Sequence, residues 1–195
     1  VYTLYKGCFW QSYQEVNLLF CKKISELIQP GDKVWIQDYQ LMLLPGMLRK
    51  RYSNLSIGYF HHIPFPSYEL FRILPERAEI LKGLLGADFI AFHTHDYMRH
   101  FISTVERVLH VNFKLNEVQL GDRVIRVEAL PMGINYNLYH DAPSKPEVRQ
   151  AIDRTRKLFG NHKVILSVDR LDYSKGILHR LRGFASFLEH YPQYH

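Results

Sequence analysis

Four short apolar runs, each followed by polar residues and then a helical pattern, constrain the fold of this chain more than any other feature. The runs cover residues 34–36, 56–60, 88–92 and 164–168. Continuous apolar runs of this length are typical of strands that are buried on both faces of a parallel sheet. Parallel strands need crossover connections, and helical periodicity such as that of residues 97–110 supplies them. The sequence therefore predicts an α/β fold with a parallel sheet.

A polar, proline-bearing stretch at residues 135–145 separates two parts of the chain. We expect residues 1–140 to form a Rossmann-like domain and residues 141–160 to form an interdomain connection with a helix. Residues 161–195 are expected to supply the first strand and helix of a second Rossmann-like domain. The chain begins with valine and has no methionine before Met42. We therefore expect it to be an internal piece of a longer polypeptide, with the amino terminus of the first domain missing.

The first helix is expected to begin at the capping-box pattern of residues 12–15. Val16, Leu19, Phe20 and Ile24 follow at helical spacing. This spacing places them on one face of the helix, and that face is predicted to be the buried one.

Composition limits the partners and the compartment. Cys8 and Cys21 cannot form a disulfide framework, so a reducing, cytoplasmic setting is expected. No apolar run approaches the roughly 20 residues that cross a bilayer, and we expect no membrane partner. The net charge of +6 suits either nucleic acid or small phosphorylated metabolites. Basic and aromatic residues do not interleave on the predicted sheet, so nucleic acid is not an expected partner.

Two cations mark the loop that follows the apolar run at residues 164–168. Arg170 and Lys175 lie between the carboxyl end of the predicted strand and a helical pattern that starts at Ile177. Ligands bind at this position in open α/β sheets. Unpaired N–H groups at the helix start, together with two cations, suit a phosphate or diphosphate. The alternative is a solvated connection that binds nothing, and the residues alone leave both readings open.

Polar side chains also follow two neighbouring strands of the first domain. Asp38 comes directly after the run at residues 34–36, where its carboxylate could accept hydrogen bonds from sugar hydroxyls or cap the next helix. His61 and His62 follow the next strand, so they are expected near Asp38 at the same sheet edge. One histidine of such a pair usually faces inward and the other outward. The proline-flanked loop that follows is stiff, which favours His62 as the oriented residue.

Other common sites have weak support. His93 and His95 form an H-x-H pattern, but no cysteine or acid stands at a recognisable ligand spacing, so no metal is expected. The sequence contains no G-x-S-x-G, P-loop or G-x-G-x-x-G pattern.

Four stretches resemble signatures of a single family. They are WIQDYQL at residues 35–41, GYFHHIPFP at residues 58–66, LPMGI at residues 130–134 and VDRLDYSKG at residues 168–176. In this order and spacing they resemble the α,α-trehalose-phosphate synthases, retaining glycosyltransferases of the GT-B type with two Rossmann-like domains. Gln37 and Gln40 stand where the family usually has histidine.

The resemblance implies transfer of glucose from UDP-glucose to glucose 6-phosphate. The products are trehalose 6-phosphate and UDP, with retention of configuration, in the first step of trehalose biosynthesis. It implies that Asp38 binds the acceptor sugar, that His62 contacts the donor glucose, and that Arg170 and Lys175 bind the donor diphosphate. These four are the expected catalytic residues, and no metal or other cofactor is expected.

Several alternatives stay open at this point. Gln37 and Gln40 motivate a non-catalytic, regulatory relative, and a GT-B transferase with another acceptor is a further reading. The preferred nucleotide (UDP, ADP or GDP), a homo-oligomeric state and a fused phosphatase domain beyond His195 are not decided. The resemblance places the glycine-rich loop of the family before Val1 and most of the nucleotide-binding domain after His195. The chain alone is therefore expected to be inactive.

Overall fold

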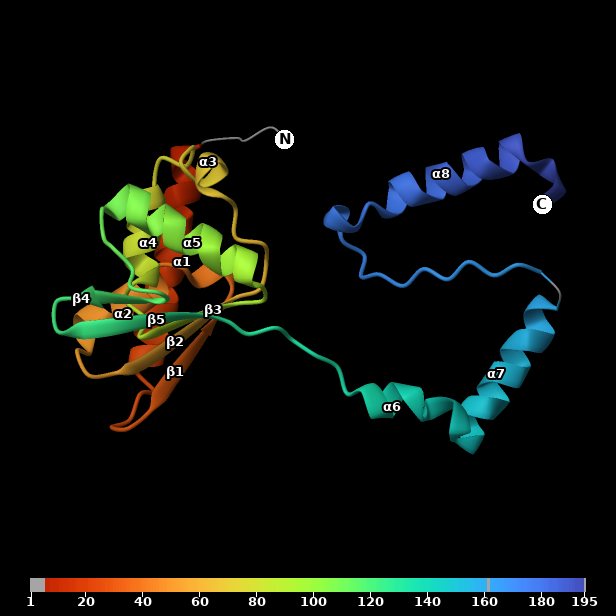
Figure 1. The fold of residues 1–195 in the computed structure, drawn as a ribbon, viewed down its shortest axis with the longest axis horizontal. Helices are drawn as coiled ribbons and strands as arrows, with labels where there is room; N and C mark the ends of the chain where they lie inside the picture. The colour runs from red at the N-terminus through yellow and green to blue at the C-terminus, as the bar shows by residue number, and fades with distance from the viewer. Residues whose placement is uncertain (1–5, 161, 195) are drawn as a thin grey trace. The chain divides into compact units, whose positions relative to one another are not determined.

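The chain forms two compact units, Val1–Gly133 and Ile134–His195. The computed structural model describes residues 6–160 and 162–194 (Figure 1). The division falls directly ahead of the polar stretch that begins at residue 135.

The first unit contains a five-stranded sheet with the order β1-β2-β3-β5-β4. The strands are β1 (Lys33–Gln37), β2 (Ser56–His61), β3 (Phe89–Phe92), β4 (Glu117–Leu120) and β5 (Arg123–Ala129). The pairs β1–β2, β2–β3 and β3–β5 are parallel, whereas β4 joins β5 as an antiparallel edge strand. The mixed α/β fold with a mostly parallel sheet confirms the fold class predicted from the apolar runs.

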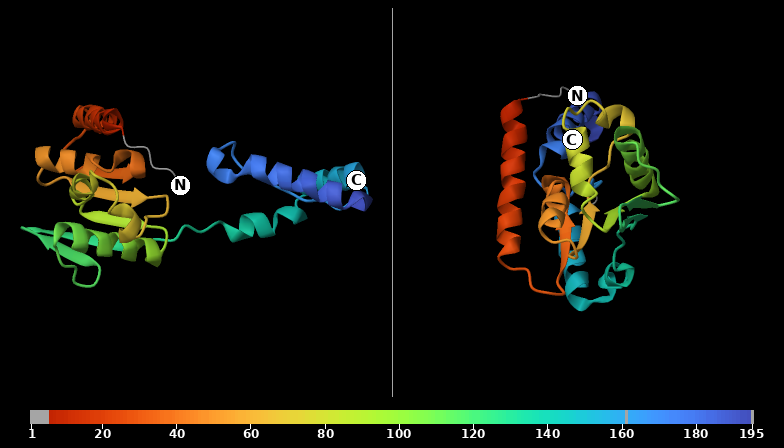
Figure 2. Two further views of the ribbon diagram at one scale, coloured as in Figure 1. Left: turned by 90° about the horizontal axis from the view of Figure 1, so that it is seen from above. Right: turned by 90° about the vertical axis from the view of Figure 1, so that its left-hand side faces the viewer.

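Helices cover one face of this sheet. They are α1 (Gly7–Ser25), α2 (Leu44–Arg51), α3 (Tyr68–Phe71), α4 (Arg77–Leu84) and α5 (His95–Leu109). Helix α2 packs against α1 and α4, and α5 packs against α4 and β5, so the row of helices follows the order of the strands (Figure 2). The side chains beneath them are in register across the sheet and fully or almost fully buried: Ile36, Tyr59, Ile90 and Val127.

The opposite face of the sheet is covered by no described helix of this unit and is buried only in part: Phe60 and Ala91 are 7% and 0% exposed. Trp35 lies on this face, is 52% exposed and stacks on Phe89 with ring centroids 6.2 Å apart. Its ring passes over Gly58, where an added Cβ would collide with it. A glycine is therefore required in β2 because the tryptophan ring occupies the space of a side chain.

Helix α1 differs from its prediction in its start and in its buried face. It begins at Gly7, so residues 12–15 lie inside the helix and do not cap it. Asn17 and Cys21 are its buried residues, while Val16 and Leu19 are 45% and 56% exposed. Asn17 Nδ2 donates to the Tyr13 carbonyl within the helix and to the Gln40 carbonyl outside it, which ties the helix to the turn after β1. The buried face is also apolar, because Trp10, Ile24 and Ile28 pack against the core on it.

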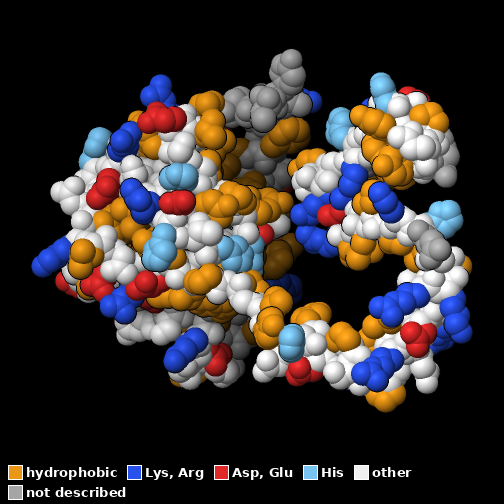
Figure 3. Space-filling model, turned by 45° about the vertical axis from the view of Figure 1, so that its right-hand side comes forward, with side chains coloured by type: hydrophobic (Ala, Val, Ile, Leu, Met, Phe, Trp, Pro, Cys, Tyr) orange, Lys and Arg blue, Asp and Glu red, His pale blue; other side chains and the backbone are white. Residues whose placement is uncertain are grey.

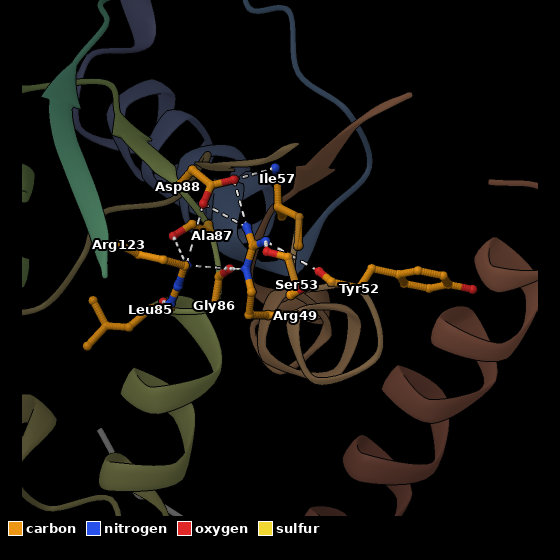
Figure 4. Close-up of polar contacts among 9 residues, drawn as sticks. All are labelled: Arg49, Tyr52, Ser53, Ile57, Leu85, Gly86, Ala87, Asp88 and Arg123. Atoms are coloured by element: carbon orange, nitrogen blue, oxygen red, sulfur yellow. Dashed lines mark hydrogen bonds and ion pairs between the residues drawn. The ribbon is translucent and has the colours of Figure 1, made fainter. Parts of the chain in front are cut away.

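An ion-pair network fixes the amino-terminal edge of the sheet (Figure 4). The carboxylate of Asp88, which precedes β3, accepts two hydrogen bonds of 2.7 Å from Arg49 and one of 2.9 Å from the backbone N–H of Ile57. Arg49 also donates to the carbonyl oxygens of Gly86 and Ser53. Arg123 donates to the Leu85 carbonyl, and its pKa is lowered by burial and by the nearby Arg49. The network therefore links α2, β2, β3 and β5.

The second unit is helical in its described residues. Its elements are α6 (Tyr136–His140), α7 (Pro146–Phe159), α8 (Ile177–His190) and the 3-10 turns Ala142–Ser144, Tyr173–Lys175 and Pro192–Tyr194. Hydrophobic side chains remain at its surface (Figure 3), among them Leu181 and Phe184 of α8.

The strand predicted at residues 164–168 is not formed. Val164 is 57% exposed and Leu166 is 83% exposed, and neither belongs to a strand. A strand is stabilised by hydrogen bonds to a neighbour, and the described residues of this unit contain no second strand to supply them. The helix predicted from Ile177 is confirmed.

The network at Asp88 predicts a specific stability loss. Asp88→Asn removes the charge shared by Arg49, whose side chain is 12% exposed, and by Arg123. We expect this chain to lose about 2–3 kcal/mol of unfolding free energy, below the roughly 3–5 kcal/mol of a fully buried pair because Asp88 is 39% exposed. Urea unfolding followed by tryptophan fluorescence measures it, since Trp10 and Trp35 both lie in the first unit.

Glu69→Gln is the matched control. It removes one exposed carboxylate that pairs with Arg107 at 3.3 Å, and it should cost less than about 1 kcal/mol. Equal losses in the two variants would contradict a special role for Asp88.

Candidate functional site

The carboxyl ends of β1, β2 and β3 meet at one edge of the sheet and gather polar side chains there. Gln37 ends β1 and Asp38 follows it, His61 ends β2 and His62 follows it, and His93 follows β3. The backbone N–H of Asp38 donates to the Phe60 carbonyl at 2.7 Å. The structure thus places these side chains together.

Asp38 and His62 are direct neighbours, as the sequence predicted. The backbone N–H of His62 donates to Asp38 Oδ1 at 3.0 Å, and Asp38 Oδ2 makes no hydrogen bond within the described part of the chain. Asp38 precedes the 3-10 turn Tyr39–Leu41 but makes no side-chain cap to it. Its carboxylate is therefore not used as a helix cap, which was the structural alternative.

The backbone of Asp38 is strained. Its φ of 67° and ψ of 174° lie in a region that residues other than glycine rarely adopt. Such a conformation costs about 1–3 kcal/mol and tends to occur at functional sites. The strain is held in place from both sides, by β2 through Phe60 and His62 and by α1 through the turn that follows.

Two residues of α1 hold that turn, and the sequence analysis missed both. The hydroxyl of Tyr13 donates to the Tyr39 carbonyl at 2.6 Å and accepts from the backbone N–H of Met42 at 3.0 Å. Burial raises the pKa of Tyr13 to about 12. Asn17 donates to the Gln40 carbonyl. The available signal was a tyrosine and an asparagine four residues apart in a helix, away from its apolar stripe.

The ring of His62 is exposed but constrained. Its Nε2 lies 2.6 Å from Gln37 Oε1, and its ring centroid lies 4.7 Å from that of Phe60 and 5.5 Å from that of His93. His93 had been considered only as half of an H-x-H metal pattern with His95. The described residues contain no group of three or more His, Cys, Asp or Glu side chains placed to hold a metal ion.

His61 is buried and faces the core, whereas His62 faces outward, as expected for the pair. His61 Nδ1 lies 2.9 Å from the Tyr59 hydroxyl, which donates to it when the imidazole is neutral. Burial lowers the pKa of His61 from 6.5 to about 4. Burial also raises the pKa of Tyr59 well above its usual range. The pair is therefore uncharged near neutral pH and packs in the core beneath this edge of the sheet.

The loop after His62 is anchored in the core. Phe65 is 1% exposed and packs against Phe71, Phe92 and Phe101 with ring centroids 5.1–5.7 Å apart. The His100 ring contacts the Phe65 carbonyl at 3.1 Å. The buried phenylalanine between two prolines thus fixes the path of the chain directly beyond His62.

Arg170 and Lys175 lie in the second unit, on a loop that leads into α8. Asp172 Oδ1 accepts hydrogen bonds from the Ser174 hydroxyl at 2.7 Å and its backbone N–H at 2.8 Å, which lower the pKa of Asp172. Gly176, with φ of 61°, connects this turn to the helix. Within the residues described for this unit, the side chains of Arg170 and Lys175 form no hydrogen bond or ion pair.

Comparison with known proteins identifies the family. Residues 3–195 match the family described as glycosyltransferase family 20. The chain belongs to this family.

Relatives in the family share both sequence and fold with the chain. It is 43% identical over 191 residues to an α,α-trehalose-phosphate synthase (UDP-forming) of Yarrowia lipolytica, covering 95% of this chain and 41% of that protein. The N-terminal domain of a Candida albicans trehalose-6-phosphate phosphatase is 40% identical, with a TM-score of 0.80, covering 95% of this chain and 40% of that one. A Burkholderia vietnamiensis α,α-trehalose-phosphate synthase (UDP-forming) is 30% identical, with a TM-score of 0.83, covering 98% and 44%. The chain thus spans about two fifths of these relatives.

Within this glycosyltransferase family 20 chain, no described helix is both long and apolar enough to cross a membrane.

The lowered pKa of His61 predicts a pH-dependent stability. Because the folded state binds this proton less tightly than the unfolded state, stability is complete above about pH 6.5 and falls as the pH drops toward about 4. The histidine should remove about 2 kcal/mol of unfolding free energy between about pH 7 and about pH 5. Urea unfolding of this chain at a series of pH values measures this slope.

His61→Gln removes the titrating ring, and its stability should depend less on pH by that amount. His110→Gln, at an exposed histidine, should keep the original slope. Identical slopes in the His61→Gln variant and the unchanged chain would show that His61 is not the source.

Proposed function

We propose that the protein containing this chain transfers glucose from UDP-glucose to glucose 6-phosphate. The products are trehalose 6-phosphate and UDP, in the first step of trehalose biosynthesis. The observation that carries the proposal is the strained Asp38, whose Oδ1 binds the His62 backbone while Oδ2 makes no hydrogen bond within the described residues. Membership of glycosyltransferase family 20 and the UDP-forming relatives support the reaction type.

In this proposal Asp38 binds hydroxyl groups of the acceptor sugar and His62 contacts the donor glucose. A carboxylate oxygen accepts hydrogen bonds from sugar hydroxyls, and charge makes such bonds strong. The backbone link between the two residues keeps both sugars in a fixed relation. Positioning of this kind lowers the barrier because two bound reactants no longer have to find each other.

Arg170 and Lys175 bind the diphosphate of the donor. The leaving UDP gains negative charge as the glycosidic bond breaks, so fixed cations stabilise the transition state more than the ground state. The amino terminus of α8 adds a partial positive charge beside them.

We infer that the transfer retains the anomeric configuration, with the leaving phosphate assisting the incoming hydroxyl. Double displacement uses two carboxyl groups, and the assigned residues include one, Asp38. No metal takes part in this scheme. The free cysteines Cys8 and Cys21 support a reducing, cytoplasmic location.

A second candidate is a non-catalytic, regulatory member of the family. Gln37 and Gln40 replace the usual histidines, and one relative is the N-terminal domain of a trehalose-6-phosphate phosphatase. The chain spans about two fifths of its relatives, so this second candidate includes a protein that carries a fused phosphatase domain.

Substitution of the two cations tests the proposed roles. In the full-length protein, Arg170→Ala and Lys175→Ala should each lower the turnover number by about a hundredfold or more, because each removes a charge that acts mainly in the transition state. A coupled assay of UDP release, with UDP-glucose and glucose 6-phosphate, measures the rate. Lys157→Ala, at a cation of α7 outside the loop, is the control and should change the rate less than about twofold.

The same assay separates the alternatives. UDP release that requires glucose 6-phosphate supports the synthase, and release with a different acceptor supports another GT-B transferase. ADP-glucose and GDP-glucose test the nucleotide. Full activity in both cation variants would refute the assigned roles, and no release from the unchanged protein with any donor and acceptor would favour the regulatory candidate.

A further inference from the structure

The environment of His62 distinguishes the two nitrogens of its ring. Nε2 lies 2.6 Å from Gln37 Oε1, and Nδ1 has no hydrogen-bond partner within the described residues. A neutral imidazole has one N–H donor and one acceptor nitrogen, and an amide oxygen can only accept. Oε1 faces the ring, and this orientation of the amide favours the tautomer with the proton on Nε2.

Three further contacts keep the ring in place. The backbone N–H of His62 is bound to Asp38, and the ring lies against Phe60 and His93 with centroids 4.7 Å and 5.5 Å away, while those two rings lie 4.9 Å from each other. The backbone N–H and one ring nitrogen are thus paired and the ring has two packed neighbours, so Nδ1 is the polar ring atom left for a ligand.

We propose that Gln37 is a positioning residue that sets the tautomer of His62. It holds the proton on Nε2, so that Nδ1 is presented as a hydrogen-bond acceptor to a sugar hydroxyl. This inference rests on the proposed function for the identity of the sugar, the donor glucose. It assigns a direction to the hydrogen bond: the sugar hydroxyl donates and His62 accepts.

This assignment gives a physical meaning to the departure from the family signature. The resemblance of residues 35–41 to the family signature implies histidine at the position of Gln37, and both side chains can offer an acceptor atom to His62 Nε2. A glutamine has no titration of its own, so its acceptor is present at every pH. In this proposal Gln37 offers the same acceptor atom as a histidine would. Its presence is then no argument for a protein that has lost activity.

The charges around His62 are few. Asp38 faces it from the end of β1, buried His61 precedes it in β2, and His93 faces it from the end of β3. An amide at position 37 adds no charge. A carboxylate there would favour the imidazolium form, in which both nitrogens donate and the acceptor at Nδ1 is lost.

The direct test observes the tautomer in the full-length protein labelled with 15N-histidine. Two-bond 1H–15N correlation spectra distinguish Nε2–H from Nδ1–H, and His62→Gln identifies the signal. We expect the Nε2–H form in the unchanged protein and a mixture of tautomers in Gln37→Met. The Nδ1–H form in the unchanged protein, or no change in Gln37→Met, overturns the proposal. This readout does not depend on the activity of the protein.

Enzyme kinetics of Gln37 variants provide a second test of the proposal. Gln37→Met should lower kcat/KM for UDP-glucose about tenfold, the worth of one hydrogen bond of about 1.4 kcal/mol. Gln37→His keeps an acceptor and should restore the rate to within about threefold near pH 8, where the added histidine is neutral. Gln119→Met, the same change at an exposed position of β4, is the control and should leave the rate unchanged.

Gln37→Glu separates a tautomer effect from a packing effect. Its rate should fall progressively below that of the unchanged protein as the pH is lowered from about 8 to about 6, because the carboxylate favours the imidazolium. A rate ratio that is constant with pH contradicts the proposal. An unchanged protein that releases no UDP refutes the proposed function, whereas the tautomer spectra still decide the role of Gln37.

Discussion

Two hydrogen bonds between the ends of β1 and β2 hold the backbone conformation on which the candidate site depends. The Asp38 N–H donates to the Phe60 carbonyl, and Asp38 Oδ1 accepts from the His62 N–H. They keep Asp38 at a φ of 67°, which an isolated chain would avoid. Tyr13 and Asn17 of α1 secure the turn that follows. Because the carboxylate and the His62 ring project from one constrained junction, their relation is set before any substrate binds.

The two edges of the sheet differ in how far their polar side chains are paired with other groups of the chain. At the amino-terminal edge, Arg49, Asp88 and Arg123 satisfy one another and several backbone carbonyls. At the carboxyl edge, Asp38 Oδ2 and His62 Nδ1 have no hydrogen-bond partner within the described residues. The ion-pair network stabilises the sheet from which these groups project, and a rigid sheet keeps them oriented. Ligands in open α/β folds usually bind at the carboxyl ends of the strands, where both groups lie.

The parallel sheet, the gathering of polar side chains at its carboxyl edge and the proximity of Asp38 and His62 could be predicted because they follow from local patterns. Apolar runs identify strands, and parallel strands end at the same edge. The buried face of α1 was predicted only in part: Ile24 packs against the core as expected, but the face is centred on Asn17 and Cys21, and Asn17 bonds to Gln40, which is far away in sequence. The strand at residues 164–168 failed for a related reason: apolar character shows that a segment can be a strand, but pairing decides whether it is one. Arg170 and Lys175 lie in the same unit as residues 164–168, and their roles stay predictions.

The most direct test of this account measures stability and activity together in Asp38→Gly. Glycine accepts the backbone conformation without strain, while the carboxylate is lost. If Asp38 is kept for function, the unfolding free energy of this chain should stay within about 1 kcal/mol of the original or rise, since relieved strain offsets one lost hydrogen bond. UDP release by the full-length variant should fall by about a hundredfold or more. A less stable variant with its activity retained would contradict the account and make Asp38 a structural residue.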